Sequence, residues 1–341
     1  MATLKDIAQR AQVSTATVSL ALSGKGRVSE QMRAKIFTIA QELGYQYRKA
    51  IPQTHKSTIM LLPVSNTWGH VWHFLKDLID YIQTRMTALG YTSLILPVLV
   101  EQPVSEVLEI IGKTGADAIY SIHHGDQELF KALSARSIPL VVVNNSEYQR
   151  DFWSVCVDDF SGSYEAINIL QEYGHTKIAY FDYPRPSLPV IFNDRFNGFR
   201  SAIQDKGLDV PEQWRITTPL EHPEELIAAI DKLIFQADRP TAFYIHDDFL
   251  ACRIHHILTS KGIRIPEDIS LLSPGDTIDY SQPESPKIST MKINTNLMGK
   301  YAVDLMMSRI QDMETDHAPH VLKIRQQLED RGSIARIHEI R

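Results

Sequence analysis

Residues 3–24, with the sequence TLKDIAQRAQVSTATVSLALSG, constrain this chain more than any other stretch. Thr3 stands three residues before Asp6, which is the spacing of a helix-capping box, and an apolar stripe at helical spacing follows. Ser14 starts a second helix after a short turn, and Ser29 starts a third that reaches Leu43. The first two helices are typical of a helix-turn-helix, whose second helix enters the major groove of DNA.

Charge is distributed unevenly along the chain, in a way that fits this interpretation. Residues 1–58 contain nine Lys and Arg against three Asp and Glu, a formal charge of +6, whereas the whole chain carries −6. The remaining residues therefore carry −12. A basic head on an acidic body is the electrostatic pattern of a nucleic-acid-binding module. A merely solvated basic surface does not explain why the charge coincides with the helix-turn-helix.

The run DIAQRAQVSTATVSLALSGKGRVS, followed by ELGY at 42–45, resembles the headpiece of the LacI/GalR family of bacterial transcription regulators. The resemblance implies an all-α, three-helix DNA-binding headpiece over 1–45. Gln12 replaces a usual Gly in the turn, which costs roughly 1 kcal/mol if that position needs a positive φ. By register with the family, the residues expected to read bases are Thr15, Ala16 and Leu20. Those expected to hold phosphates are Ser14, Thr17, Ser19, Arg27, Ser29 and Arg33.

The linker over 46–58 departs from the family pattern. The family usually has a short hinge helix here, with a Leu that enters the minor groove. Thr54 occupies that Leu position, and Pro52 falls inside the expected helix, where Pro is tolerated only in the first turn. Ile51 is a candidate substitute for the Leu. The alternative interpretation is a plain extended linker.

Short apolar runs alternate with helical periods through residues 59–341, as expected for doubly wound parallel sheets. Local motifs, among them Gly262–Ser270, continue the family resemblance, which implies a two-lobed α/β core like a type I periplasmic binding protein. We expect the chain to pass three times between the lobes. The predicted N-lobe covers about 59–156 and 290–320, and the predicted C-lobe covers about 157–289 and 321–341.

The resemblance also implies an effector site between the lobes. Arg195 matches a family Arg that binds ligand hydroxyls or a carboxylate, for which its planar donor group is suited. Asp247 matches a polar ligand-facing position, and Asn144 follows a predicted strand. A usual ligand-binding Asp is missing, since Gly275 occupies its place and Asp276 follows one residue later.

A loop over 66–73 follows the first strand of the core, where this architecture places ligand contacts. Its Trp68, His70 and Trp72 are candidates to stack on a sugar or another planar ligand, and aromatic packing or a subunit contact is the alternative. His123 and His124 follow another strand and are further candidates. A sugar or sugar derivative is the expected effector, with nucleobases and sugar phosphates as the other classes.

Other classes of protein fit the sequence less well. No run of about 20 apolar residues, signal peptide, phosphate-binding glycine motif or zinc-ligand spacing is present. A solute-binding protein would need an export signal, and a Rossmann-like enzyme would need a cofactor motif or a catalytic pair. We therefore expect a cytoplasmic, non-enzymatic regulator without cofactor or metal. Its expected partners are operator DNA, a small-molecule effector and a second copy, in a homodimer or a tetramer.

Overall fold

The computed structural model describes residues 3–23, 28–43, 56–64, 72–99, 101–184, 191–311 and 318–337. Two compact units divide the chain, the first over Met1–Lys56 and the second over Ser57–Arg341. Four residues with predicted roles lie outside the described residues: Arg27, Ile51, Trp68 and His70.

Three helices form the first unit: α1 (Leu4–Ala11), α2 (Thr15–Ser23) and α3 (Glu30–Glu42). The predicted capping box is present, because Thr3 Oγ1 accepts from the Asp6 backbone N–H while the Asp6 carboxylate accepts from the Thr3 backbone. The three helices bury one small core, made of Ile7, Ala8, Ala11, Val18, Ala21, Ile36, Ile39 and Ala40. This core fixes which face of α2 is left exposed.

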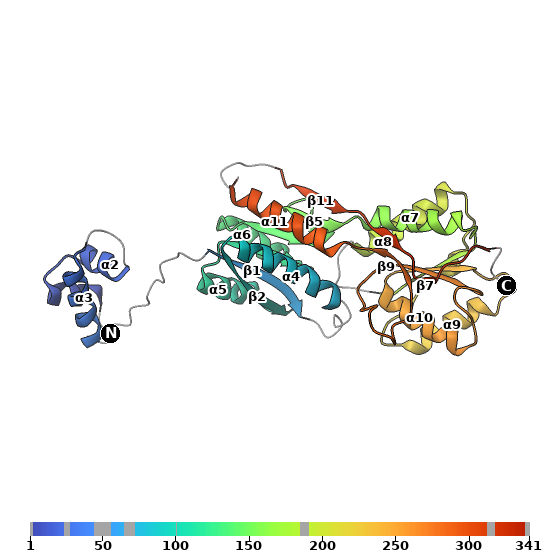
Figure 1. Cartoon of the computed structure of the whole chain (residues 1–341), viewed down its shortest axis with the longest axis horizontal. Helices are drawn as coiled ribbons and strands as arrows, with labels where there is room; N and C mark the ends of the chain where they lie inside the picture. The colour runs from blue at the N-terminus through green and yellow to red at the C-terminus, as the bar shows by residue number, and fades with distance from the viewer. Residues whose placement is uncertain are drawn as a thin grey trace. The chain divides into compact units, whose positions relative to one another are not determined.

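The second unit contains two sheets of six strands (Figure 1). The first sheet has the order β11-β5-β4-β3-β1-β2. Its strands are β1 (Lys56–Val64), β2 (Tyr91–Leu99), β3 (Ala118–Ile122), β4 (Leu140–Val143), β5 (Ser154–Val157) and β11 (Val321–Ile324). Its helices are α4 (Trp72–Ala88), α5 (Val104–Thr114), α6 (Gln127–Ala135) and α11 (Thr295–Gln311). Together these elements form the N-lobe.

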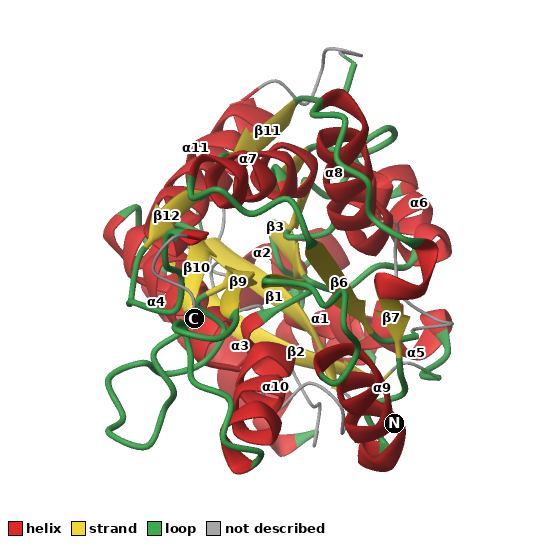
Figure 2. Cartoon of the chain, turned by 90° about the vertical axis from the view of Figure 1, so that its right-hand side faces the viewer, coloured by secondary structure: helices red, strands yellow, loops and turns green. Residues whose placement is uncertain are grey.

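The second sheet has the order β12-β10-β9-β8-β6-β7. Its strands are β6 (Ile178–Asp182), β7 (Arg215–Thr217), β8 (Ala242–Ile245), β9 (Ser270–Gly275), β10 (Ser289–Lys292) and β12 (Gln327–Glu329). Its helices are α7 (Asp159–Glu172), α8 (Ile191–Asp205), α9 (Pro223–Ile234) and α10 (Asp248–Ser260). These elements form the C-lobe, whose strands lie between helices in Figure 2.

Successive residues of each buried strand point to opposite faces of its sheet, so both faces need cover. In the N-lobe, Met60 packs with α4 and α11, whereas Ile59 and Leu61 pack with α5 and α6. In the C-lobe, Tyr244 packs with α7 and α8, whereas Phe243 packs with α9 and α10. Among the described residues, the pairs β1–β3, β3–β4, β4–β5, β5–β11, β6–β7, β6–β8, β8–β9 and β9–β10 are parallel and β10–β12 is antiparallel, in keeping with the predicted doubly wound architecture.

The chain crosses between the lobes three times, at Asp158, at 293–294 and at 325–326. Two predicted lobe boundaries were wrong by a few residues. β10 belongs to the C-lobe sheet because it pairs with β9, although the predicted N-lobe began at 290. β11 belongs to the N-lobe sheet because it pairs with β5, although the predicted C-lobe resumed at 321. Pairing between strands distant in sequence decided both boundaries.

Among the described residues, no helix is both long and apolar enough to cross a bilayer. Within the same residues, no group of three or more His, Cys, Asp or Glu side chains could hold a metal ion.

Candidate functional site

The second helix of the headpiece presents one exposed polar face. Thr15, Ala16 and Ser19 are exposed, and Leu20 keeps 42% of its surface accessible, whereas Val18 and Ala21 are fully buried. The residues predicted to read bases therefore share the outward face of α2. This face presents hydroxyl and methyl groups to a base edge. Methyl groups can make apolar contacts with the methyl group of thymine.

The turn before α2 is fixed by two local features. Gln12 has a left-handed backbone (φ 58°), the conformation for which the family's usual Gly is suited. Ser14 Oγ accepts from the Thr17 backbone N–H at 3.0 Å and lies 2.8 Å from Thr17 Oγ1. Ser14 thus caps the helix, and its neighbour Thr17 is half-buried beside it.

Two residues predicted to hold phosphates stabilise the headpiece itself. Ser29 Oγ accepts from the Met32 backbone N–H at 3.4 Å and caps α3. Arg33 Nη1 donates to the Ala21 carbonyl at 3.0 Å, so it binds a carbonyl near the end of α2. Arg33 therefore joins α3 to α2.

In the second unit, the carboxyl ends of the two sheets adjoin the crossovers. β5 runs from the N-lobe sheet directly into the first crossover, and β10 runs from the C-lobe sheet into the second. Because parallel strands end at the same edge, both edges meet where the chain changes lobe. This is the region where doubly wound sheets bind ligands.

Arg195 lies at this edge of the C-lobe, in an ion pair that the sequence did not predict. Its Nε donates to Asp159 Oδ1 at 2.8 Å, and its Nη1 donates to the His246 carbonyl at 2.8 Å. The side chains of Arg195 and Asp159 are 11% and 1% exposed. Burial opposes the charge on Arg195, but Asp159 outweighs it and holds the pKa of the guanidinium above its ordinary value.

Asp159 also connects two crossovers. Gln326 Nε2 donates to Asp159 Oδ1 at 3.1 Å, and the Asp158 backbone N–H donates to the Ile324 carbonyl at 2.9 Å. Asp159 could have been predicted as a site residue, because two consecutive Asp residues follow a strand at this position. Nothing in the sequence indicated Gln326, because it lies between two short strands 167 residues away.

Asp247, predicted to face the effector, also caps a helix. Its Oδ1 accepts from the Leu250 backbone N–H at 2.8 Å, and its Oδ2 accepts from the Tyr183 hydroxyl. The adjacent His246 is fully buried, with Nδ1 3.3 Å from Asp182 Oδ1. Tyr183, His246 and Asp182 are site residues that sequence reasoning missed.

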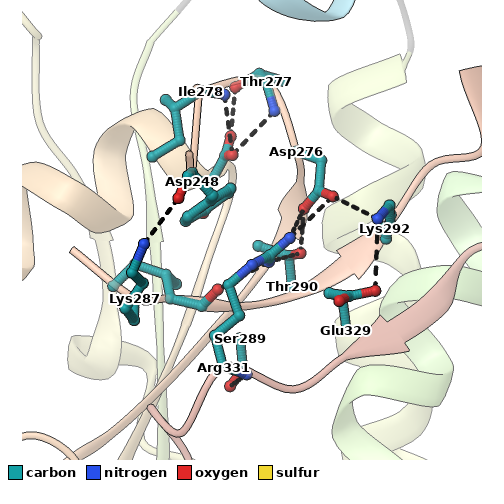
Figure 3. A network of polar contacts seen from close by, with 12 residues as sticks. Asp248, Asp276, Thr277, Ile278, Lys287, Ser289, Thr290, Lys292, Glu329 and Arg331 are labelled. Carbon is teal, nitrogen blue, oxygen red and sulfur yellow. Dashed lines mark hydrogen bonds and ion pairs between the residues drawn. The ribbon is translucent and has the colours of Figure 1, made fainter. Parts of the chain in front are cut away.

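Asp276, whose effector role stays a prediction, lies in an ion pair that the sequence did not predict. Both of its carboxylate oxygens accept from Arg331 Nη2 at 3.0 Å, as part of the network in Figure 3. Arg331 also stacks on the ring of Tyr280. The loop after β9 has φ 70° at Asp276. Asp276 holds this loop in place.

Gly275, where the family's ligand-binding Asp is missing, lies against another carboxylate. A Cβ at this position would come within 2.5 Å of Asp248 Cγ. Asp248 is fully buried and accepts from the backbone N–H groups of Thr277 (2.9 Å) and Ile278 (3.3 Å). Burial raises the pKa of Asp248 to about 6.

On the N-lobe side, Asn144 and His123 lie together at the carboxyl edge. Both have positive φ, and Asn144 Nδ2 lies 3.1 Å from His123 Nδ1. The next residue, His124, is buried, which lowers the pKa of its imidazole. Trp72, the first residue of α4, is 55% exposed. The structure thus brings Asn144 and His123 into contact.

Two family models match this chain. The model "Bacterial regulatory proteins, lacI family" matches residues 3–47, which contain α1 to α3. The model "Periplasmic binding protein-like domain" matches residues 167–334, which contain most of the C-lobe, α11 and β11. Each match lies within one of the two compact units.

Relatives match over nearly the whole length. The HTH-type transcriptional repressor PurR of Klebsiella pneumoniae (strain 342) is 28% identical, over 98% of this chain and 97% of that protein. A solved complex of the transcriptional regulator CelR with cellobiose has a TM-score of 0.68 at 21% identity, covering 98% and 100%. The lac repressor dimer bound to operator and the anti-inducer ONPF has a TM-score of 0.66 at 18% identity, covering 98% and 99%. The structural likenesses establish the fold. The two family models and the PurR relative show that this chain belongs to the LacI family of bacterial regulatory proteins, and is a DNA-binding transcriptional regulator rather than an enzyme.

Proposed function

We propose that the chain is a repressor that reads operator DNA through the exposed face of α2. One observation carries the proposal: Thr15, Ala16, Ser19 and Leu20 are exposed together, while the opposite side of the same helix is buried. This face offers hydroxyl and methyl groups and no guanidinium or carboxamide. Base preference should therefore depend on short polar contacts and on thymine methyl groups, with Lys and Arg around the helix supplying affinity.

The effector binds, in our proposal, at the carboxyl edges of the two sheets. Arg195 and Asp247 supply polar groups from the C-lobe, and Asn144 and His123 supply them from the N-lobe. A sugar or sugar derivative is the leading class, with nucleobases as the alternative. Effector binding changes operator affinity only if the ligand prefers one arrangement of the lobes, and about 1–3 kcal/mol is the usual scale of such coupling.

A second copy of the chain completes the functional unit, because two headpieces then reach two half-sites of a near-palindromic operator. β2 lies at an edge of the N-lobe sheet and exposes Leu94, Ile95 and Leu99. We assign this apolar edge to the contact between copies. A regulator of transcription acts on the chromosome, so we place it in the bacterial cytoplasm.

The test begins with a duplex selected by the full-length protein from a random library. Mobility shifts then measure its affinity with and without each member of a metabolite panel. We expect a clear preference over random duplex and a change in affinity with at least one metabolite. No preference, with or without every metabolite tried, would overturn the proposal.

Two variants assign the roles of the two regions. Thr15→Ala should alter base preference across operator variants, since Thr15 lies on the exposed face of α2. Arg195→Lys keeps the positive charge but removes the planar donor group. It should weaken the effector response at least about tenfold, while operator affinity without effector stays within about twofold. Lys76→Arg, in an exposed ion pair on α4, is the matched control.

A further inference from the structure

We infer that the effector is an uncharged or positively charged molecule rich in hydrogen-bond donors, and that the site rejects anions. The inference rests on the proposed function, because it assumes that the effector binds at the carboxyl edge of the C-lobe. It selects hydroxyl-rich and amino-substituted compounds over sugar phosphates and sugar acids. Four features of the structure support it.

First, the positive charge of Arg195 is already neutralised inside the protein. Asp159 accepts from its Nε at 2.8 Å, and the His246 carbonyl accepts from its Nη1 at the same distance. Both side chains of the ion pair are nearly removed from solvent. A buried ion pair with this geometry offers no net positive charge to a phosphate or a carboxylate.

Second, the neighbours of Arg195 at this edge are carboxylates. Asp182 ends β6, Asp247 follows β8, and Asp248 begins the next helix. With Asp159, these neighbouring elements of the C-lobe contribute four carboxyl groups to the edge. An anionic ligand would bring a further negative charge into this set, and like-charge contacts in a desolvated interface are strongly unfavourable.

Third, the nearby cations after β9 and β10 are engaged elsewhere. Arg331 donates to Asp276 from Nη2 and to Thr290 Oγ1 from Nη1, as Figure 3 shows. Its Nη1 also donates to the Ile288 carbonyl. Lys292 lies 3.5 Å from both Asp276 and Glu329. These contacts hold the ends of β9, β10 and β12 together, so the charges are committed to the fold.

Fourth, a buried acceptor beside the first crossover, Asp159 Oδ2, has no donor within the described part of the chain. Asp159 is 1% exposed. A buried acceptor without a partner is costly, and a hydroxyl or ammonium group of a ligand would satisfy it. An anion would add acceptors where donors are needed.

The experiment compares ligands that share a skeleton and differ in charge. Glucose, glucosamine, gluconate and glucose 6-phosphate form one series, and ribose with ribose 5-phosphate forms another. Thermal stability and operator affinity of the full-length protein are measured with each at constant ionic strength. We expect the anionic members to bind at least about tenfold more weakly than their neutral or cationic parents, or not at all. Tighter binding of an anionic member, or operator release by it alone, would overturn the inference and leave the proposed function intact.

A charge-removing variant tests the physical cause directly, with inorganic phosphate as the probe. Asp159→Asn removes the negative charge that neutralises Arg195, so phosphate should stabilise this variant thermally but not the unchanged protein. Asp80→Asn, which removes an exposed carboxylate from α4, is the matched control and should show no phosphate effect.

The outcomes separate the inference from the proposed function. Phosphate stabilisation of the unchanged protein that Arg195→Lys weakens, or no phosphate effect on Asp159→Asn, would contradict the inference. Should Asp159→Asn fail to fold, Asp247→Asn, which removes a second carboxylate from the same edge, replaces it. Failure of the proposed function has a different signature, because operator DNA is then not preferred over random duplex.

Discussion

Gln326 Nε2 donates to Asp159 Oδ1 at 3.1 Å, so a side chain in the third crossover holds a carboxylate that follows the first. The same oxygen accepts from Arg195 Nε. Gly162 makes room for this contact, since a Cβ there would lie 2.0 Å from Gln326 Oε1. The candidate effector residue Arg195 is therefore connected through a single carboxylate to two of the three segments in which the chain crosses between the lobes.

Removing this connection should affect both stability and regulation. Gln326→Ala deletes a buried hydrogen bond to a charged group, so the free energy of unfolding should fall by about 1.5–3 kcal/mol in chemical denaturation. The change in operator affinity that an effector produces should shrink as well. Gly162→Ala should have the same effect on regulation, because it displaces the Gln326 side chain. Gln311→Ala, at an exposed site, is the control. An unchanged effector response in both variants would show that Gln326 is only structural.

The absence of an acidic side chain at position 275 has a steric cause that can be tested. Gly275→Ala places a Cβ within 2.5 Å of the buried Asp248 carboxyl group, so it should destabilise the protein by about 1–3 kcal/mol. Gly112→Ala is the matched control, since nothing lies within 4 Å of its Cβ in α5, and it should stabilise by roughly 0.5–1 kcal/mol. Thermal unfolding measures the change in stability for both variants. Equal changes for Gly275→Ala and Gly112→Ala would contradict the steric explanation.

His175 should make stability depend on pH. The ring is fully buried, with Nε2 3.0 Å from the Ala335 carbonyl and Nδ1 2.9 Å from Thr241 Oγ1, and burial lowers the pKa of His175 to about 4. The ordinary value is 6.5, so the unfolded chain binds more protons between these two values. Above pH 6.5, His175 therefore does not lower the free energy of unfolding. As the pH falls toward 4, its titration lowers the free energy of unfolding by about 3 kcal/mol at most.

The measurement is the free energy of unfolding from pH 7.5 to pH 4 for the unchanged protein and for His175→Gln. The variant lacks the titrating ring. The difference in free energy of unfolding between the unchanged protein and His175→Gln should therefore become smaller as the pH falls. His222→Gln removes an exposed ring that is 56% accessible and pairs with Glu224 at the surface, so it should change the pH dependence much less than His175→Gln does. A constant difference across the range would rule out His175 as the source.

Leu20 provides a test of apolar readout. It is 42% exposed on the face of α2 that carries Thr15 and Ala16. Leu20→Ala should weaken binding to the selected operator by about 1–3 kcal/mol and relax preference at one base pair. The slope of log affinity against log salt concentration should not change, because no phosphate contact is lost. A changed slope, or uniform weakening across all operator variants, would count against a base contact.

The sequence by itself determined the three headpiece helices, the two doubly wound sheets and the outward face of α2. These follow from local signals: capping residues such as Thr3 and Ser14, and apolar periods that differ between helices and buried strands. Arg195 and Asp247 could be named in advance because they follow recognisable motifs. The effector roles assigned to them remain predictions.

Only the tertiary structure decided what these side chains contact. Asp159 and Gln326 meet because two crossovers lie side by side, and Arg331 reaches Asp276 across 55 residues of sequence. Strand pairing between β11 and β5 likewise set the lobe boundary. Such contacts depend on packing between distant segments, for which a periodic pattern carries no information. The charge that Arg195 offers to a ligand is therefore a property of the fold, whereas the residue itself is a property of the sequence.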